Sequence, residues 1–215
     1  MYCIVLITCF AIFLPAVGST AYANPKPKRL ELRVGQWTPS SKVQSPGNDS
    51  GESSPSSGGL AAAWNFSYWM KDRLALSLSV SGVIADNSVS AGLLGISSDM
   101  VMLSTFLVGV RYDLSNRSRV RPYLTAEIGP TFGFGNHNEI GLQTFAGTPV
   151  HKQGLGTAIS ARISTGMDLI LGKRYVVGGT AGFTKMTDFS TSVGPRNNYS
   201  GFEIGISLGL QLGKR

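Results

Sequence analysis

Cysteine is almost missing from this chain of 215 residues. Its only two cysteines, Cys3 and Cys9, lie in an early apolar segment that we expect to be removed on export. The remaining chain then has no disulfide, although disulfides stabilise many exported proteins. Neither cysteine closes a lipoprotein signal, because each lies well before the small residues that end the apolar segment. The fold must therefore be held by something other than covalent cross-links.

Residues 1–23 have the pattern of a secretory signal peptide. An apolar run at residues 4–17 is followed by Ala21-Tyr22-Ala23, which is a small-x-small cleavage site. The run is shorter than the roughly twenty residues that a membrane-spanning helix needs. We expect cleavage after Ala23, a short N-terminal periplasmic segment at residues 24–29, and one folded domain at residues 30–215.

Charged residues and long apolar runs are both scarce. Asp, Glu, Lys and Arg make up 14% of the chain, against about 25% in ordinary soluble domains. After the signal segment, no apolar stretch approaches the length of a spanning helix. Low charge without such a stretch is typical of a β-barrel that crosses a membrane with its strands.

What the chain does have is strict alternation, which is clearest at residues 199–212. One face of this segment carries six large apolar side chains: Phe202, Ile204, Ile206, Leu208, Leu210 and Leu212. The other face carries mostly Gly and Ser. A period of two indicates a β-strand. A strand facing water would carry Lys, Glu and Thr, so the small face indicates a crowded interior and the apolar face indicates lipid.

Alternation predicts eight strands, at residues 30–37, 60–70, 74–85, 100–113, 120–134, 157–171, 175–187 and 199–212. The connections between them alternate in length: short turns at 71–73, 114–119 and 172–174, and long loops at 38–59, 86–99, 135–156 and 188–198. Outer-membrane barrels have this arrangement, with tight periplasmic turns, long extracellular loops and an even strand number. The predicted fold class is all-β, an eight-stranded antiparallel up-and-down transmembrane β-barrel. A soluble lipocalin-like barrel is the main alternative, but its strands would carry charges facing the solvent.

The net charge of +7 is unevenly distributed. Of the 19 basic residues, 12 fall on the predicted periplasmic rim: Lys26, Lys28, Arg29, Lys71, Arg73, Arg117, Arg119, Arg121, Lys173, Arg174, Lys214 and Arg215. The long loops hold more acidic than basic residues. A basic rim fits anionic lipid headgroups, so we expect outer-membrane phospholipid and lipopolysaccharide as partners. We expect no nucleic acid, because no basic groove or known binding module is present.

Aromatic residues cluster at the ends of the predicted strands. Five lie at the tight-turn ends: Tyr68, Trp69, Tyr112, Tyr123 and Tyr175. Five lie at the long-loop ends: Trp37, Phe132, Phe134, Phe183 and Tyr199. We expect two girdles at the membrane interfaces, although aromatic residues also favour strands in general.

The candidate site is a charge network in the barrel interior, formed by Arg33, Glu127, Arg162, Asp168 and Glu203. Glu31 also falls on an inward position. Strand adjacency predicts that Glu127 pairs with Arg162 and that Arg33 pairs with Glu203, because an unpaired buried charge would cost several kcal/mol. Eight strands enclose a lumen that is filled by side chains or holds one small ligand. The network is therefore either a static plug or the lining of a narrow channel, which the small inward residues of several strands would favour.

We predict no enzyme, no cofactor and no metal site. The only histidines, His137 and His151, lie with Glu139 in one long loop, without ligand spacing or a neighbouring nucleophile motif. Hydrolysis by a hydroxyl nucleophile would need a serine, a base and an orienting acid within reach of one another. A lipid A-modifying enzyme is thus the weakest functional hypothesis.

Two segments carry a resemblance to a known family: Arg121-Pro122-Tyr123-Leu124 followed by Gly129, and the final strand with Glu203, Gly205, Leu208 and Leu210. On these, residues 30–212 resemble the outer membrane protein β-barrel domain family, which includes the OmpA-like and OmpX-like small eight-stranded barrels. The resemblance implies location in the cell outer membrane and insertion by the barrel assembly machinery.

From the sequence we expect a monomer with a structural or surface-interaction role, exerted through four long extracellular loops. The extracellular partner is unknown. A narrow conduit for ions or small solutes is the alternative.

Overall fold

The computed structural model describes residues 27–40, 58–92, 95–115, 118–141, 150–172, 174–191, 193 and 197–213; at 86–99 and 136–153 it describes the backbone alone. The predicted signal peptide therefore lies outside the described residues. Among the residues that it does describe, no helix is long and apolar enough to cross a membrane.

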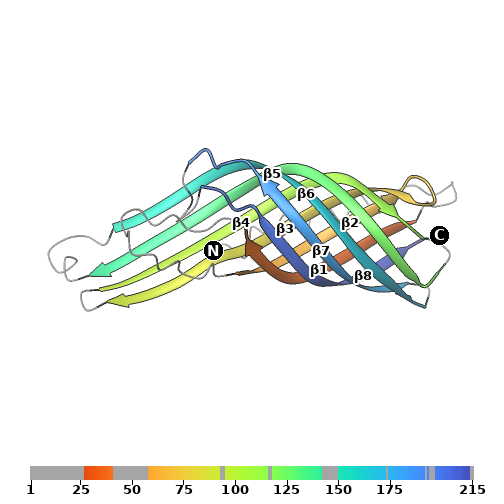
Figure 1. The fold of residues 1–215 in the computed structure, drawn as a ribbon, viewed down its shortest axis with the longest axis horizontal. Coiled ribbons are helices and arrows are strands. Elements are labelled where there is room, and N and C mark those ends of the chain that lie inside the picture. Colours follow the sequence, from red (N-terminus) through yellow and green to blue (C-terminus); the bar gives the residue numbers. More distant parts are fainter. Residues whose placement is uncertain are drawn as a thin grey trace.

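Eight antiparallel strands close into one barrel in simple sequence order (Figure 1). They are β1 (Lys28–Pro39), β2 (Gly59–Trp69), β3 (Leu74–Gly92), β4 (Gly95–Asp113), β5 (Val120–Gly141), β6 (Val150–Leu171), β7 (Tyr175–Met186) and β8 (Gly201–Leu212). Closure is made by β1 and β8, which pair from Lys28 opposite Leu212 to Pro39 opposite Gly201. The predicted fold class and strand order are confirmed. β1 begins two residues before the predicted domain boundary, so Lys28 and Arg29 belong to the barrel.

The predicted loops at 86–99 and 135–156 are wrong for most of their length. β3 and β4 stay paired up to Gly92 opposite Gly95, and β5 and β6 up to Glu139 opposite Val150. β4 also stays paired with β5 up to Gly95 opposite Gly141. These segments are strands by their backbone pairing, although their sequence lacks the strict alternation of the other strand segments.

The strands β3 to β6 consequently project beyond the other four as a four-stranded sheet (Figure 1). Pairing of β1 with β2 stops at Trp37 opposite Gly59, and pairing of β7 with β8 stops at Thr184 opposite Gly201. The loop end of the barrel is therefore asymmetric, with one tall side and one short side.

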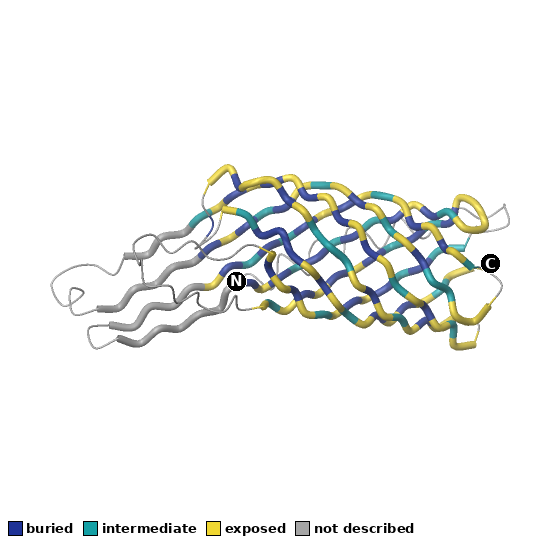
Figure 2. The backbone as a smooth tube through the Cα atoms, in the orientation of Figure 1, coloured by how far each residue is buried: buried dark blue, intermediate teal, exposed yellow. Residues whose placement is uncertain are grey.

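Burial alternates along the described part of every strand (Figure 2). The exposed positions carry large apolar side chains, for example Ile163 at 69% and Ile206 at 74% exposure. The buried positions carry arginines, carboxylates, serines and small residues. The polarity of a soluble protein is thus inverted over this band, and the physical reason is that lipid, rather than water, is the solvent for the outer face.

Candidate functional site in the barrel interior

The lumen is filled by three groups of side chains that follow one another from the tight turns to the long loops. The turn-end cluster consists of Arg29, Glu31, Arg111, Asp113 and Asp168. The middle cluster consists of Arg33, Glu127, Arg162 and Glu203. The mouth cluster is apolar and consists of Trp37, Ala61, Val83, Ala85, Val101, Leu103, Ala158, Met186, Phe189, Val193 and Tyr199.

The middle cluster is centred on Arg162 of β6. Its Nε lies 2.9 Å and its Nη2 lies 2.5 Å from Oε2 of Glu127, the residue directly opposite on β5. Its Nη1 lies 3.8 Å from Glu203 of β8, and Glu203 in turn lies 2.9 Å from Nε of Arg33 on β1. Two arginines and two glutamates therefore form a balanced chain of charges with no side chain more than a tenth exposed.

Two serines of β3 form hydrogen bonds with the middle cluster. Ser77 donates a hydrogen bond to Glu127 at 2.6 Å, and Arg162 donates one to Ser79 at 2.6 Å. Because β3 is not a neighbour of β5 or β6 in the sheet, these bonds join strands that are not adjacent in the barrel wall. Small side chains on β3 thus make room for the long side chains of other strands, rather than leaving a channel.

The turn-end cluster is centred on Asp168 of β6. This carboxylate accepts hydrogen bonds from both Arg29 of β1 and Arg111 of β4. Arg111 also donates to Asp113 at 2.9 Å, while Glu31 lies 3.5 Å from Arg29 and 3.8 Å from Arg111. Two guanidinium groups are therefore shared among three carboxylates, all of them buried.

Two aromatic residues seal the turn-end cluster. The guanidinium of Arg111 lies 3.6 Å from the ring centroid of Tyr123 and 5.9 Å from that of Trp69, and Arg29 lies 5.2 Å from the Trp69 ring. The indole N–H of Trp69 also donates to Asp113 at 3.2 Å. These contacts are within the range of cation–π attraction, so the aromatic rings are part of the plug.

The predicted aromatic girdles are therefore wrong for four of the ten residues. Trp69 and Tyr123 at the turn end, and Trp37 and Tyr199 at the loop end, are each at most 3% exposed and face the lumen. Tyr112, Tyr175 and Phe134 do face outward, with exposures of 42%, 57% and 47%. Position near a strand end does not decide which face a side chain occupies, whereas the parity of the residue does.

A small cavity of about 20 Å³ lies between the two charged clusters. Its lining includes Glu31 and Arg111 on the turn side and Arg33 and Glu127 on the loop side. This is little more than the roughly 10–15 Å³ that one water needs. A cavity of this size has room for about one water but not for a solute.

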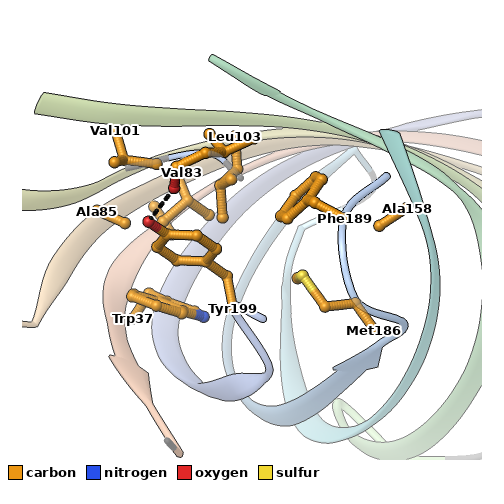
Figure 3. Close-up of a cluster of buried hydrophobic side chains, with 11 residues drawn as sticks. Trp37, Val83, Ala85, Val101, Leu103, Ala158, Met186, Phe189 and Tyr199 are labelled. Carbon is orange, nitrogen blue, oxygen red and sulfur yellow. Dashed lines mark hydrogen bonds between the residues drawn. The ribbon is translucent and has the colours of Figure 1, made fainter. Parts of the chain in front are cut away.

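At the loop end, the described part of residues 187–200 (187–191, 193 and 197–200) brings Phe189, Val193 and Tyr199 into the barrel mouth (Figure 3). Phe189 and Val193 are buried against β5 and β6, where an added Cβ on Gly133 would lie 3.0 Å from Phe189 and 3.1 Å from Val193. Tyr199 packs its ring 6.2 Å from Trp37 and 6.0 Å from Phe189 between centroids, and donates its hydroxyl to the carbonyl of Val193 at 2.6 Å.

Backbone hydrogen bonds hold Thr187 and Ser190 to the edge of β6. The amide of Thr187 donates to the carbonyl of Ile159 at 2.9 Å, and the amide of Ser190 donates to that of Thr157 at 3.1 Å. The described part of the predicted loop at 188–198 is thus not a free extracellular loop, because Phe189 and Val193 fill the barrel mouth.

All five predicted site residues lie in the interior. The structure brings Arg33, Glu127, Arg162 and Glu203 together and forms both expected pairs, Glu127 with Arg162 and Arg33 with Glu203. Asp168 lies apart from them, in the turn-end cluster.

Sequence reasoning missed Arg111 and Asp113 and placed Arg29 on the periplasmic rim rather than in the lumen. The parity of β4 contained the signal, because Arg111 and Asp113 alternate with the outward residues Val110 and Tyr112. For Arg29 the signal was absent, since the predicted strand began one residue later.

The described side chains contain no group of three His, Cys, Asp or Glu that could hold a metal ion. His137, His151 and Glu139 lie on the projecting parts of β5 and β6, where side chains are outside the described part of the chain.

The molecule belongs by its architecture to the class of small eight-stranded antiparallel barrels with an apolar exterior and a filled interior. No protein-family model matches its sequence, and no curated protein does.

Solved structures of the same architecture are similar in fold. Neisserial surface protein A is 13% identical, with 87% of this chain and 96% of that chain covered and a TM-score of 0.54. Ail, the attachment invasion locus protein of Yersinia pestis, is 6% identical, with coverages of 87% and 99% and a TM-score of 0.55. OprG of Pseudomonas aeruginosa is 14% identical, with coverages of 88% and 97% and a TM-score of 0.50. The expected likeness to small outer-membrane barrels is thereby confirmed at the level of the fold.

Proposed function

We propose that this chain is an integral outer-membrane barrel that acts as a structural and surface-interaction protein. The apolar outer face supports a location in a membrane, and the filled lumen supports a role that does not depend on transport. Two of the proteins with a similar fold are named for the cell surface or for attachment. Of the four predicted loops, the one at 188–198 is a weaker candidate for surface contacts, because its Phe189 and Val193 side chains are buried in the barrel mouth. Residues 41–57 of the first predicted loop lie outside the described residues.

The observation that carries this proposal is the projecting sheet of β3 to β6. Beyond Ala85, the described pairing of β3 is with β4. At residues 150–156, the described pairing of β6 is with β5. A sheet edge offers backbone N–H and C=O groups to an added strand. Among the described residues, the projecting sheet therefore has two edges without a neighbouring strand, which suits binding of an extended segment of another protein.

The test shortens both projecting hairpins, replacing residues 86–100 and 136–153 each by an Asn-Gly turn of the type that closes tight hairpins. Cells that display the full chain or the shortened chain are compared for adherence to immobilised host-surface proteins and glycans and to one another. Equal amounts of folded barrel are verified by heat-modifiable gel mobility. We expect adherence of the full chain and its loss in the shortened chain; equal adherence, or none by either, would contradict the proposal.

A narrow conduit is the competing function, and single-channel conductance separates the two. The refolded chain in a planar bilayer is expected to be silent, because side chains close the lumen on both sides of a cavity that fits about one water. Discrete openings of the wild type that Arg162→Ala abolishes would overturn the plug and establish the conduit. We also propose that the chain is not an enzyme, since its described side chains include no histidine and no assembled nucleophile, base and acid.

A further inference from the structure

We propose that the turn end of the barrel carries a register-fixed ring of arginines that binds the phosphate groups of anionic phospholipids in the adjacent leaflet. Arg73, Arg119 and Arg174 occupy equivalent places, each immediately before the first residue of β3, β5 or β7. All three are exposed. This site is at the opposite end from the projecting sheet, so it stands or falls independently of the proposed surface role.

The backbone fixes the three arginines in the same way at each turn. The carbonyl of Arg73 accepts a hydrogen bond from the amide of Asp113 at 2.8 Å. The carbonyl of Arg119 accepts one from Ile170 at 2.9 Å, and that of Arg174 accepts one from Gln211 at 2.7 Å. Each donor belongs to the strand that follows in the sequence: Asp113 to β4, Ile170 to β6 and Gln211 to β8. The arginines are therefore held at corresponding points around the barrel rim rather than on free loops.

The depth of these arginines matches lipid headgroups. Each is followed directly by a residue of the outward apolar face, and Val120 and Tyr175 are 42% and 57% exposed there. Consecutive Cα atoms are about 3.8 Å apart, so each guanidinium originates within one residue of the apolar band. Long arginine side chains reach from such a position to the interface, and guanidinium binds phosphate oxygens in a bidentate manner.

The described residues of this rim carry mostly positive charge. Lys71 is also exposed at the first turn, and Asp72 is the only carboxylate among the described residues of the three turns. The turns themselves are short, so these cations remain close to the bilayer surface. Each Lys or Arg that lies close to an anionic membrane surface strengthens binding to that surface by roughly fivefold.

The experiment measures lipid selectivity in the first lipid shell with spin-labelled phosphatidylglycerol and spin-labelled phosphatidylcholine, using the chain refolded in phosphatidylcholine vesicles. The wild type is expected to favour phosphatidylglycerol by at least about twofold averaged around the barrel. The triple variant Arg73→Gln, Arg119→Gln and Arg174→Gln is expected to lose most of that preference. Its charge-preserving counterpart, with Lys at all three positions, should retain it in large part.

Lys185→Gln is the matched control, because Lys185 is an exposed cation at the loop end of β7; the preference should survive this change. Heat-modifiable mobility must be the same for all variants, since the substituted side chains are exposed. A wild type without preference, or a triple glutamine variant that keeps it, would overturn the proposal. Loss of the preference in inorganic phosphate, but not in sodium chloride of equal ionic strength, would also overturn it and indicate a site for free anions.

Discussion

At the scale of single residues, each described carboxylate of the two charged clusters lies against at least one arginine. Glu127 contacts Arg162, Glu203 contacts both Arg33 and Arg162, and Asp168 accepts from two arginines. Burial of these groups is tolerable because every carboxylate faces at least one guanidinium, although Arg29, Arg33 and Asp168 each keep a buried polar atom with no hydrogen-bond partner among the described residues. The clusters join strands that are not neighbours in the sheet, so they brace the barrel from within.

Removal of the Arg162 side chain is expected to destabilise the barrel. Arg162→Ala leaves Glu127 with Ser77 as its remaining described hydrogen-bond partner, and breaking a buried ion pair from one side costs about 3–5 kcal/mol. Chemical unfolding of the refolded chain in detergent micelles, followed by tryptophan fluorescence, measures the free energy of unfolding.

Two further variants show whether that loss comes from the unpaired carboxylate. The double variant Arg162→Met with Glu127→Leu should regain much of the stability, because no buried charge is then left alone. Lys185→Ala removes an exposed cation and should change stability by no more than about 0.5 kcal/mol. If Arg162→Ala were as stable as the wild type, the middle cluster would have no bracing role.

At the scale of elements, Phe189 and Val193, which follow β7, are complementary in shape to glycine positions on β5 and β6. Gly156 has no side chain where an added Cβ would lie 2.6 Å from Val193 and 3.0 Å from Phe189. This close approach explains how an apolar segment between β7 and β8 enters the barrel mouth. It also explains why Phe189 and Val193 are buried although they lie outside any long strand.

Gly156→Ala is expected to displace the plugging segment without opening the barrel wall. The new methyl group would overlap Val193, so the hydrogen bonds from the amides of Phe189 and Ser190 should weaken. Hydrogen exchange of these two amides should accelerate by about tenfold or more, which corresponds to a loss of roughly 1.4 kcal/mol. Gly179→Ala is the matched control, because nothing lies within 4 Å of an added Cβ there. Equal exchange in the two variants would show that Gly156 does not determine the position of the plug.

At the scale of the whole molecule, the barrel separates an outer apolar face from an inner polar one. The three tryptophans sample both, because Trp64 is 39% exposed on the outer face while Trp37 and Trp69 are 3% exposed in the lumen. The closed sheet holds each tryptophan on its own side of the barrel wall. The difference in exposure between Trp64 and the other two tryptophans therefore tests the whole architecture.

Lipid-borne quenchers are expected to distinguish these tryptophans. Variants that keep a single tryptophan, with Phe at the other two positions, are refolded in vesicles whose phospholipids carry brominated acyl chains. Fluorescence of Trp64 should be quenched strongly, and that of Trp37 and Trp69 weakly, because the barrel wall separates these two from lipid. Strong quenching of Trp69 would show that the turn-end cluster is exposed to the bilayer.

The sequence alone determined the strands that lie in the membrane, because lipid on one side and a packed lumen on the other impose a period of two on every crossing. It also determined the pairing of Glu127 with Arg162, since they lie on consecutive strands at inward positions. Even the inward orientation of Trp69 and Tyr123 could have been read from parity, which sets the face of a strand residue more firmly than its nearness to a strand end.

Only the tertiary structure decided the rest, because it depends on contacts between distant segments. Asp168 meets Arg29 and Arg111 across the lumen, and strand tilt and register fix that meeting rather than any local pattern. The projecting part of β3 to β6 is defined by backbone pairing between these strands rather than by a period-two pattern in the sequence. Phe189 and Val193 enter the barrel mouth because Gly133 and Gly156 leave room for them, and such complementarity exists only once the strands are side by side.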